Sequence, residues 1–186
     1  MPMQFNRATQ EPYLRLLPPH SNIIITPHRL GQFEHEVTSR VEILNHPQVW
    51  PFLAGTPYPY LAEHAEEWVR TDYEEKRAVI EALRLGYNQD SSGCDLSESN
   101  LAFFDQCPFT CIRQVLSEDP EGHPLQDNFI GDIALRRYSF YEHLTGSSER
   151  TAAQAHNKAL PPGDKEIVWG LGCSLPRDMH SWMFFL

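Results

Sequence analysis

The chain has 186 residues, of which 41% are hydrophobic and 22% charged, and it carries a formal net charge of −10 at pH 7. These proportions are typical of one globular domain with a buried core, and an acidic surface repels phosphate backbones, so we expect no nucleic-acid partner. No apolar run approaches the roughly 18 residues that a membrane-spanning helix needs, and the N-terminus lacks the apolar core of a secretory signal, so we expect no membrane association.

The cysteines are few and irregularly spaced. They are Cys94, Cys107, Cys111 and Cys173. Such a set does not form the regular pattern of a disulfide framework. We therefore expect a reducing compartment and a cytoplasmic location.

Residues 1–20 contain charges and prolines without a clear periodicity, and we expect them to be a loose leader before a domain that spans 21–186. The β-branched run Ile23–Thr26, closed by Pro27, predicts a short strand. Apolar residues then recur at helical spacing from Phe33 to Leu44 and predict an amphipathic helix that ends near Asn45.

A connection with two prolines and two tyrosines, "AGTPYPY" at 54–60, leads to the strongest predicted helix, which starts near Leu61. The inner stripe of that helix comprises Leu61, Ala65, Trp68 and Val69, and the opposite side is acidic. The polar segment near 86–102 cannot bury enough apolar surface to order itself, so we expect a loop insertion there.

Two strands around a turn follow, "CPFTCIRQVLSED" and "FIGDIALRRYSF", and predict an antiparallel pair. In the second strand Phe129, Gly131, Ile133 and Leu135 are expected on one face, with Asp132, Ala134 and Arg136 on the other. Residues 144–165 form a second polar segment that we expect to be another loop insertion.

The final predicted strand, Ile167–Leu175, has large residues at alternate positions and mostly small ones, including Gly170, Gly172 and Ser174, between them. Small side chains along one face allow another group to approach the backbone closely, either a packed helix or a ligand. The order strand, helix, helix, strand, strand, strand indicates an α+β or mixed α/β fold with its helices early in the chain.

Catalytic motifs are sparse. His64 and Glu66, with Cys107 and Cys111 downstream, partly match the zinc site of nucleobase deaminases. The cysteine spacing and the proline position differ from that motif, so we expect no metal. The histidines beside prolines or in polar segments are expected to be exposed turn residues; they are His20, His28, His46, His123 and His156.

Four phrases in order, "EILNHPQVWPFLAGTPYPYLAEHAEEWV", "CPFTCIRQV", "FIGDIALRR" and "EIVWGLGCSLP", resemble the GNAT superfamily of N-acetyltransferases. The resemblance is closest to the branch of ribosomal-protein-alanine acetyltransferases and covers roughly residues 22–176. It implies a mixed, largely antiparallel acetyltransferase-like sheet that opens after its fourth core strand. Acetyl-CoA would be the co-substrate and would lie along that strand.

The resemblance also implies site residues. Gly172, Cys173, Ser174 and Leu175 would line the thioester arm of acetyl-CoA, and Glu166 would be the catalytic base, although a carboxylate that serves only solubility is the alternative. Tyr58 and Tyr60 would form the wall for the amine acceptor, a protein N-terminus or a small molecule. The implied function is transfer of acetyl from acetyl-CoA to a primary amine.

After "GLGCSLP" the chain continues as "RDMHSWMFFL", without the glycine-rich loop that binds pyrophosphate in this family. We therefore expect residues 21–186 to form an incomplete, truncated N-acetyltransferase-like domain that lacks the C-terminal half of the fold. The alternative function is a catalytically inactive acetyltransferase-like fragment.

Overall fold

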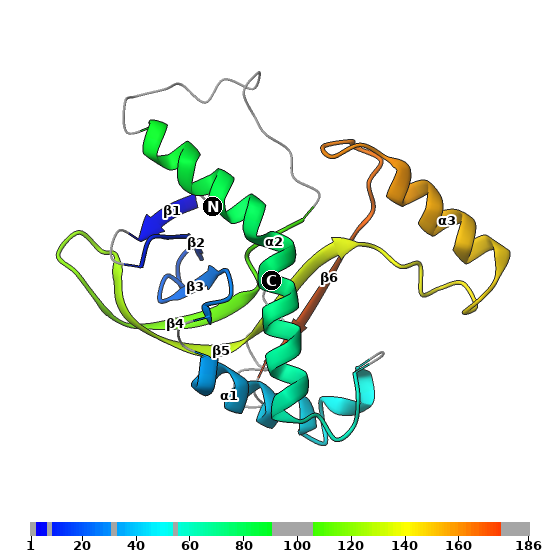
Figure 1. The fold of residues 1–186 in the computed structure, drawn as a ribbon, viewed down its shortest axis with the longest axis horizontal. Helices are drawn as coiled ribbons and strands as arrows, with labels where there is room; N and C mark the ends of the chain where they lie inside the picture. The colour runs from blue at the N-terminus through cyan, green and yellow to red at the C-terminus, as the bar shows by residue number, and fades with distance from the viewer. Residues whose placement is uncertain (1–2, 7–8, 31–32, 54–55, 91–105, 176–186) are drawn as a thin grey trace.

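A computed structural model describes residues 3–6, 9–30, 33–53, 56–90 and 106–175. They form a mixed α/β fold with a six-stranded antiparallel sheet (Figure 1). In chain order the elements are β1 (Met3–Asn6), β2 (Glu11–Arg15), β3 (Ile23–Thr26), α1 (Phe33–Asn45), the short 3-10 helix η2 (Trp50–Phe52), α2 (Ala62–Asp90), β4 (Cys111–Glu118), β5 (Pro124–Arg137), α3 (Ser148–Ala159) and β6 (Trp169–Ser174).

The strands lie in the sheet in their chain order, β1 to β6, and each pairs with its neighbour in antiparallel fashion. The predicted strand at 23–26, the β4–β5 pair and the last strand are therefore confirmed. Since consecutive strands are neighbours, the two helices α1 and α2 are inserted between two paired strands, β3 and β4, and α3 between β5 and β6.

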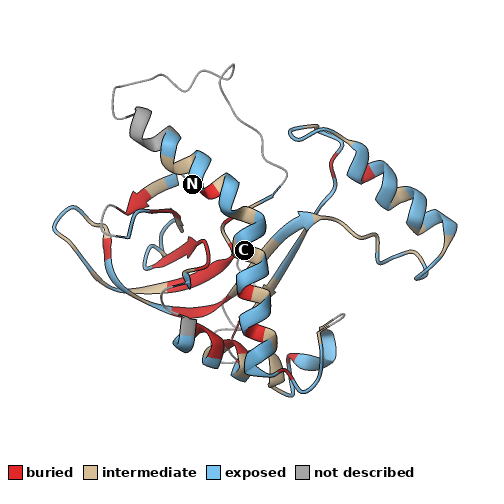
Figure 2. Cartoon of the chain, viewed as in Figure 1, coloured by how far each residue is buried: buried red, intermediate tan, exposed pale blue. Residues whose placement is uncertain are grey.

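Helices α1 and α2 pack on the same face of the sheet. The Arg40 guanidinium of α1 lies 5.0 Å from the ring of Trp68 in α2 and is bonded to Asp132 of β5. Apolar side chains join the layers: Ile43 of α1 packs with Cys111 and Phe129 of the sheet. Figure 2 shows the buried residues concentrated in the central strands and on the inward sides of these two helices.

The opposite face of the sheet carries a second apolar group, which consists of Ile23, Ile112, Ile130 and Leu175. These residues are between 3% and 9% exposed, so they form a second apolar core, separate from the one under α1 and α2. It is built by β3, β4, β5 and the residue after β6. In the described part of the chain, no helix is long and apolar enough to cross a membrane.

Residues 1–20 are not a loose leader in the part that the structure describes. Strands β1 and β2 pair with each other, and β2 continues the sheet at β3. Phe5 and Tyr13 are 3% and 1% exposed, and Glu11 pairs with Arg29. The prediction failed because these strands are only four and five residues long, and because β2 contains a charged residue, Glu11, that is buried as an ion pair.

The segment 144–165 is not an unstructured loop, because it contains α3. Ser147 caps this helix by accepting a hydrogen bond from the backbone N–H of Arg150 at 3.2 Å. Figure 1 shows α3 standing away from the rest of the molecule, and Asn157 is its one buried residue. The helix was missed because it has no apolar stripe. Helix α2 also continues to Asp90, into the predicted 86–102 loop, and residues 91–105 lie outside the described part.

The predicted alternation of β5 is wrong at one point. Gly131 pairs with Ile112 and Phe129 pairs with the next residue, Arg113, so Ile130 is an extra residue in β5, a β-bulge. Phe129 therefore faces the helices together with Asp132, instead of sharing a face with Gly131.

Candidate functional site

Strand β6 lies at the edge of the sheet. It pairs with β5 through six residue pairs, from Asp132–Ser174 to Arg137–Trp169, and within the described residues no strand pairs with its other flank. An unpaired flank presents backbone N–H and C=O groups that can bind an extended ligand.

The backbone groups that point outward from this edge can be identified. The N–H of Ile133 donates to the carbonyl oxygen of Thr110, toward β4, and the N–H of Tyr138 donates to Val168, toward β6. Because N–H directions alternate along a strand, the polar groups of Gly170, Gly172 and Ser174 face β5. The groups of Leu171 and Cys173 consequently point to the free flank.

The side of β6 that faces the helices is open at Gly172. A Cβ atom built there would meet no atom of the described residues within 4 Å. Gly172 pairs with Ala134, so the two residues share a face of the sheet, and Ala134 lines a groove between β5 and α2. The groove and the open glycine are therefore neighbours on the same surface.

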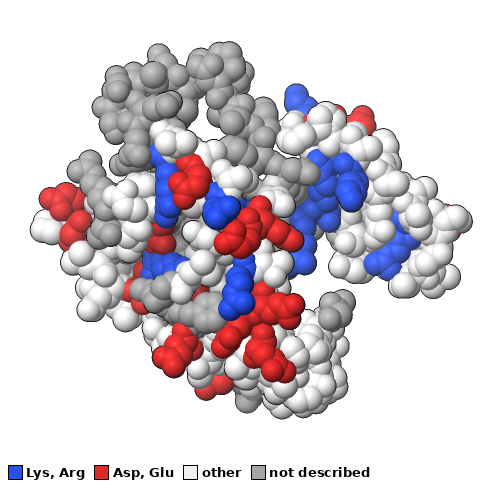
Figure 3. All heavy atoms as spheres, viewed as in Figure 1, with Lys and Arg blue, Asp and Glu red and all other residues white. Residues whose placement is uncertain are grey.

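The edge groove has a volume of about 350 Å³. Its lining comes from α2, from the segment before β4 and from the end of β5: Trp68, Thr71, Asp72, Glu75, Lys76, Gln106, Cys107, Ala134, Leu135, Arg136 and Arg137. Both charge signs are present, with the carboxylates on α2. Figure 3 shows Lys and Arg side chains gathered where the sheet approaches α3. A ligand with one cationic and one anionic part would find partners here.

The four residues predicted to line the thioester arm differ in accessibility. Gly172 is exposed, Cys173 and Ser174 are half-buried, and the Leu175 side chain is buried in the core with Ile23 and Ile112. Burial, together with the negative charge of Asp132, raises the pKa of Cys173 to about 11, so this thiol is not a ready nucleophile. Leu175 is 8% exposed as a whole residue, so the structure does not place it on the surface that a ligand would contact.

Glu166, the predicted base, is exposed and precedes β6 by three residues. Its backbone N–H donates to the Asp164 carboxylate at 2.8 Å. It does not line the edge groove.

The two tyrosines predicted for the acceptor wall lie in different surroundings. Tyr58 is 61% exposed and stacks on Trp50, with ring centroids 4.6 Å apart. Tyr60 is 5% exposed and packs between Val37 and Ala65, and burial raises its pKa to about 12. Neither lines the edge groove, so the structure does not bring them together with the β6 residues there.

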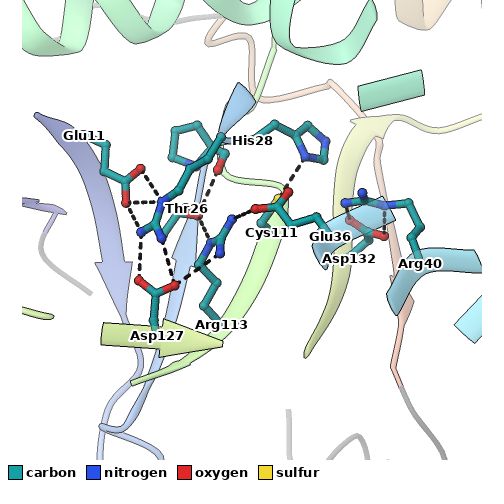
Figure 4. Close-up of polar contacts among 11 residues, drawn as sticks. Glu11, Thr26, His28, Glu36, Arg40, Cys111, Arg113, Asp127 and Asp132 are labelled. Carbon is teal, nitrogen blue, oxygen red and sulfur yellow. Dashed lines mark hydrogen bonds and ion pairs between the residues drawn. The ribbon is translucent and has the colours of Figure 1, made fainter. Parts of the chain in front are cut away.

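A network of buried charges joins the sheet to α1 (Figure 4). The Arg113 side chain is 1% exposed and pairs with Glu36 of α1 and, at 3.2 Å, with Asp127 of β5. Asp127 also pairs with Arg29 at 2.8 Å, and Arg29 with Glu11. Each charge thus has an opposite partner, which offsets the cost of removing it from water.

A second buried group, which we call the buried cluster, consists of His28, Asp72, Cys111, Asp132 and Arg40. Cys111 Sγ lies 2.9 Å from His28 Nδ1, and His28 Nε2 lies 3.2 Å from Asp72 Oδ2. Burial favours the neutral imidazole, but Cys111 and Asp72 outweigh it and raise the pKa of His28 to about 10. Burial likewise favours the neutral acid at Asp72, but His28 and Lys76 lower its pKa below the ordinary value.

The sequence analysis missed the buried cluster. His28 follows a proline and was expected to be exposed, yet it is 3% exposed and packs edge-on against Trp68. His64, considered above for zinc, instead accepts a hydrogen bond from the N–H of Leu61 at the start of α2. The cluster members come from four separate elements and the segment after β3, so no local spacing could have revealed them.

Comparisons with known proteins identify no relative. The chain matches no family model, no curated protein and no solved structure.

Proposed function

We propose that this chain is an N-acetyltransferase-type acyltransferase that moves acetyl from acetyl-CoA to a primary amine, with acetyl-CoA bound along the free flank of β6. The observation that carries the proposal is the open edge: β6 is unpaired on one side within the described residues, and its Gly172 faces empty space. Apart from the added helix α3, the element order from β3 to β6, with α1 and α2 inserted early, is also that expected from the family resemblance.

In this proposal the arm of acetyl-CoA extends the sheet. The outward N–H and C=O groups of Leu171 and Cys173 would pair with the amide groups of the arm, as an added strand would. An N–H at the same edge would stabilise negative charge on the thioester oxygen during the reaction.

The reaction needs a deprotonated amine. The amine nitrogen attacks the thioester carbonyl carbon, the carbon–sulfur bond breaks, and the thiolate of CoA leaves and takes up a proton. Glu166 is the proposed base, acting directly or through water. The carboxylate of Glu75 in the edge groove would attract a cationic amine acceptor.

The second candidate is a catalytically inactive acetyltransferase-like domain. The observation that favours it is the composition of β6, "WGLGCS", which contains no acid or base, while Glu166 lies outside the edge groove. Binding of acetyl-CoA without transfer would be the signature of this candidate.

Calorimetric titration with acetyl-CoA and with S-acetylpantetheine tests the proposal, because the second ligand contains the arm without the nucleotide. Gly172→Leu would fill the open space and should weaken binding of both ligands at least tenfold. The matched control is Gln126→Leu, which adds the same side chain at an exposed position of β5 that pairs with β4, away from the edge.

Transfer is measured separately, as release of the CoA thiol in the presence of a primary amine. Release that depends on the amine and falls in Glu166→Gln supports the acyltransferase. Binding without release supports the inactive domain. No binding of either ligand to the folded chain overturns the acyltransferase and leaves only the inactive domain.

A further inference from the structure

The buried cluster brings together three different metal-binding side chains. His28 follows β3, Cys111 begins β4 and Asp132 lies in β5, and one ligand atom from each lies within 4.8 Å of the others. Figure 4 shows these side chains converging between the sheet and α1. Cys111 is fully buried and His28 is 3% exposed, so they are shielded from water.

The surroundings of these residues resemble the outer shell of a metal site. His28 Nε2 lies 3.2 Å from the Asp72 carboxylate, and Arg40 holds Asp132 through contacts of 2.7 and 2.9 Å. In metalloproteins a ligating histidine commonly donates its other ring N–H to a carboxylate, and ligating carboxylates are themselves hydrogen-bonded. Both arrangements are present here.

The cluster does not satisfy its own polar atoms. His28 Nε2, Asp72 Oδ2 and Arg40 Nη1 are buried and have no well-directed hydrogen bond within the described structure. A metal ion on His28 Nδ1 would place the imidazole proton on Nε2, opposite the Asp72 oxygen. A small rotation of the metal-bound imidazole would then align this close contact as a hydrogen bond.

The geometry points to a zinc site whose ligands are His28 Nδ1, Cys111 Sγ and an Asp132 carboxylate oxygen. Nitrogen, thiolate sulfur and carboxylate oxygen are the three ligand types that zinc accepts in proteins. The thiolate and the carboxylate bring two negative charges to the ion, and Asp132 shares its charge with Arg40, to which it is hydrogen-bonded. This inference is independent of acetyl transfer and departs from the expectation of no metal.

The site must open slightly to admit the ion. Zinc–ligand distances of about 2.3 Å to sulfur and 2.0 Å to nitrogen place the two atoms about 3.5 Å apart in a tetrahedral site. His28 Nδ1 and Cys111 Sγ are 2.9 Å apart, as hydrogen-bonded partners. The two atoms must therefore move apart by about 0.6 Å, and the proton that they share must be released when the ion binds.

A nucleophilic triad is the rival interpretation, because Cys111, His28 and Asp72 follow one another as nucleophile, base and orienting acid. Cys111 has 0% exposure, however, so no substrate can reach its sulfur. A structural ion requires no such access once it is enclosed. We therefore favour the metal.

The test uses Co²⁺, which replaces zinc and gives an intense near-ultraviolet band when a thiolate binds it. The full chain is unfolded, refolded with Co²⁺ present so that a buried site can fill, and freed of excess metal. One equivalent of bound Co²⁺ with this band is expected. Cys111→Ser should abolish the band, whereas Cys107→Ser and Cys173→Ser, at two half-buried thiols outside the site, should retain it.

Asp72→Asn provides a second measurement, because it removes the carboxylate behind His28, which also pairs with Lys76, and leaves all three ligands in place. It should weaken metal affinity about 10- to 100-fold while the band persists. Circular dichroism checks that each variant has folded. The inference is overturned if the refolded wild-type chain binds no Co²⁺, or if the band survives in Cys111→Ser.

Discussion

The central strands of the sheet and its edge strand β6 differ in how they are packed. The central strands β3 and β4 are paired on both flanks, covered by α1, and joined to α1 and β5 by buried ion pairs. Around β6, one flank is open within the described residues, Leu171 is 68% exposed, and Gly172 faces empty space. The first region has the packing that stabilises a fold, and the second has the free backbone that a ligand needs.

The difference indicates that the central strands stabilise the fold, while the edge strand is free to bind a ligand. Buried charges that each have a partner are costly to disturb, because removal of one leaves another uncompensated. An edge strand can change with little cost to the fold. Substitutions in the two regions should therefore separate stability from binding.

The largest loss of stability is expected for Arg113→Ala. It leaves Glu36 and Asp127 without their shared partner in a buried site, at a cost of about 3–5 kcal/mol. Urea denaturation measures the free energy of unfolding. The matched control is Arg77→Ala, whose ion pair with Glu74 is exposed, and a similar loss in both variants would contradict the contrast.

The next largest effect is expected for Gly131→Ala, which should lower the free energy of unfolding by about 1–3 kcal/mol. A Cβ there would overlap the carbonyl oxygen of Ser174 and approach Leu175, so it would push the end of β6 away from β5. In the control Gly172→Ala the added Cβ has no neighbour within 4 Å among the residues that the structure describes, so the free energy of unfolding should stay almost unchanged. Equal effects of these two changes on the thermal unfolding midpoint would remove the distinction between the closed and open parts of β6.

Asn157→Ala should loosen α3. The Asn157 amide accepts a hydrogen bond from the Val168 N–H at 3.0 Å and donates one to the Val168 carbonyl oxygen at 2.9 Å. Loss of both should cost about 2 kcal/mol in the local stability of the segment before β6. Limited proteolysis between residues 138 and 168 should accelerate, while cleavage elsewhere stays constant. Unchanged proteolysis would show that the contact between Arg137 and the end of α3 is enough to hold this segment in place.

The smallest effect is expected for Leu171→Thr, because this side chain is largely exposed. The free energy of unfolding should change by less than about 0.5 kcal/mol. The same variant should retain binding of S-acetylpantetheine, since Leu171 would contact the ligand through its backbone. A large loss of stability would mean that the Leu171 side chain is covered in solution.

Local patterns were enough to predict the central elements. The run Ile23–Thr26, the helical spacing before Asn45 and the hairpin between β4 and β5 are each encoded by neighbouring residues. Strands β1 and β2 were missed because their stability comes from distant partners, such as Arg29 for Glu11. The sequence could place Gly172 on a strand, but it could not show that this strand is at an edge of the described sheet.

The combination of His28, Cys111 and Asp132 could not be predicted for the same reason, and the partial zinc motif paired Cys111 with a different histidine, His64. His28 and Cys111 are 83 residues apart and meet only because β3 and β4 are neighbours. A histidine after a proline gives no local sign that it will be buried. Long-range strand pairing decides which side chains share a site.

The additional residue at Ile130 determines where two carboxylates can act. Asp127 and Asp132 are five positions apart, and in a regular strand an odd separation would send them to opposite faces. The one-residue offset reverses that parity, so both face α1 and each meets an arginine, Arg113 and Arg40. Deleting Ile130 would turn Asp127 toward the second apolar core, and a single lost residue would thereby dismantle half of the charge network without altering any charged side chain.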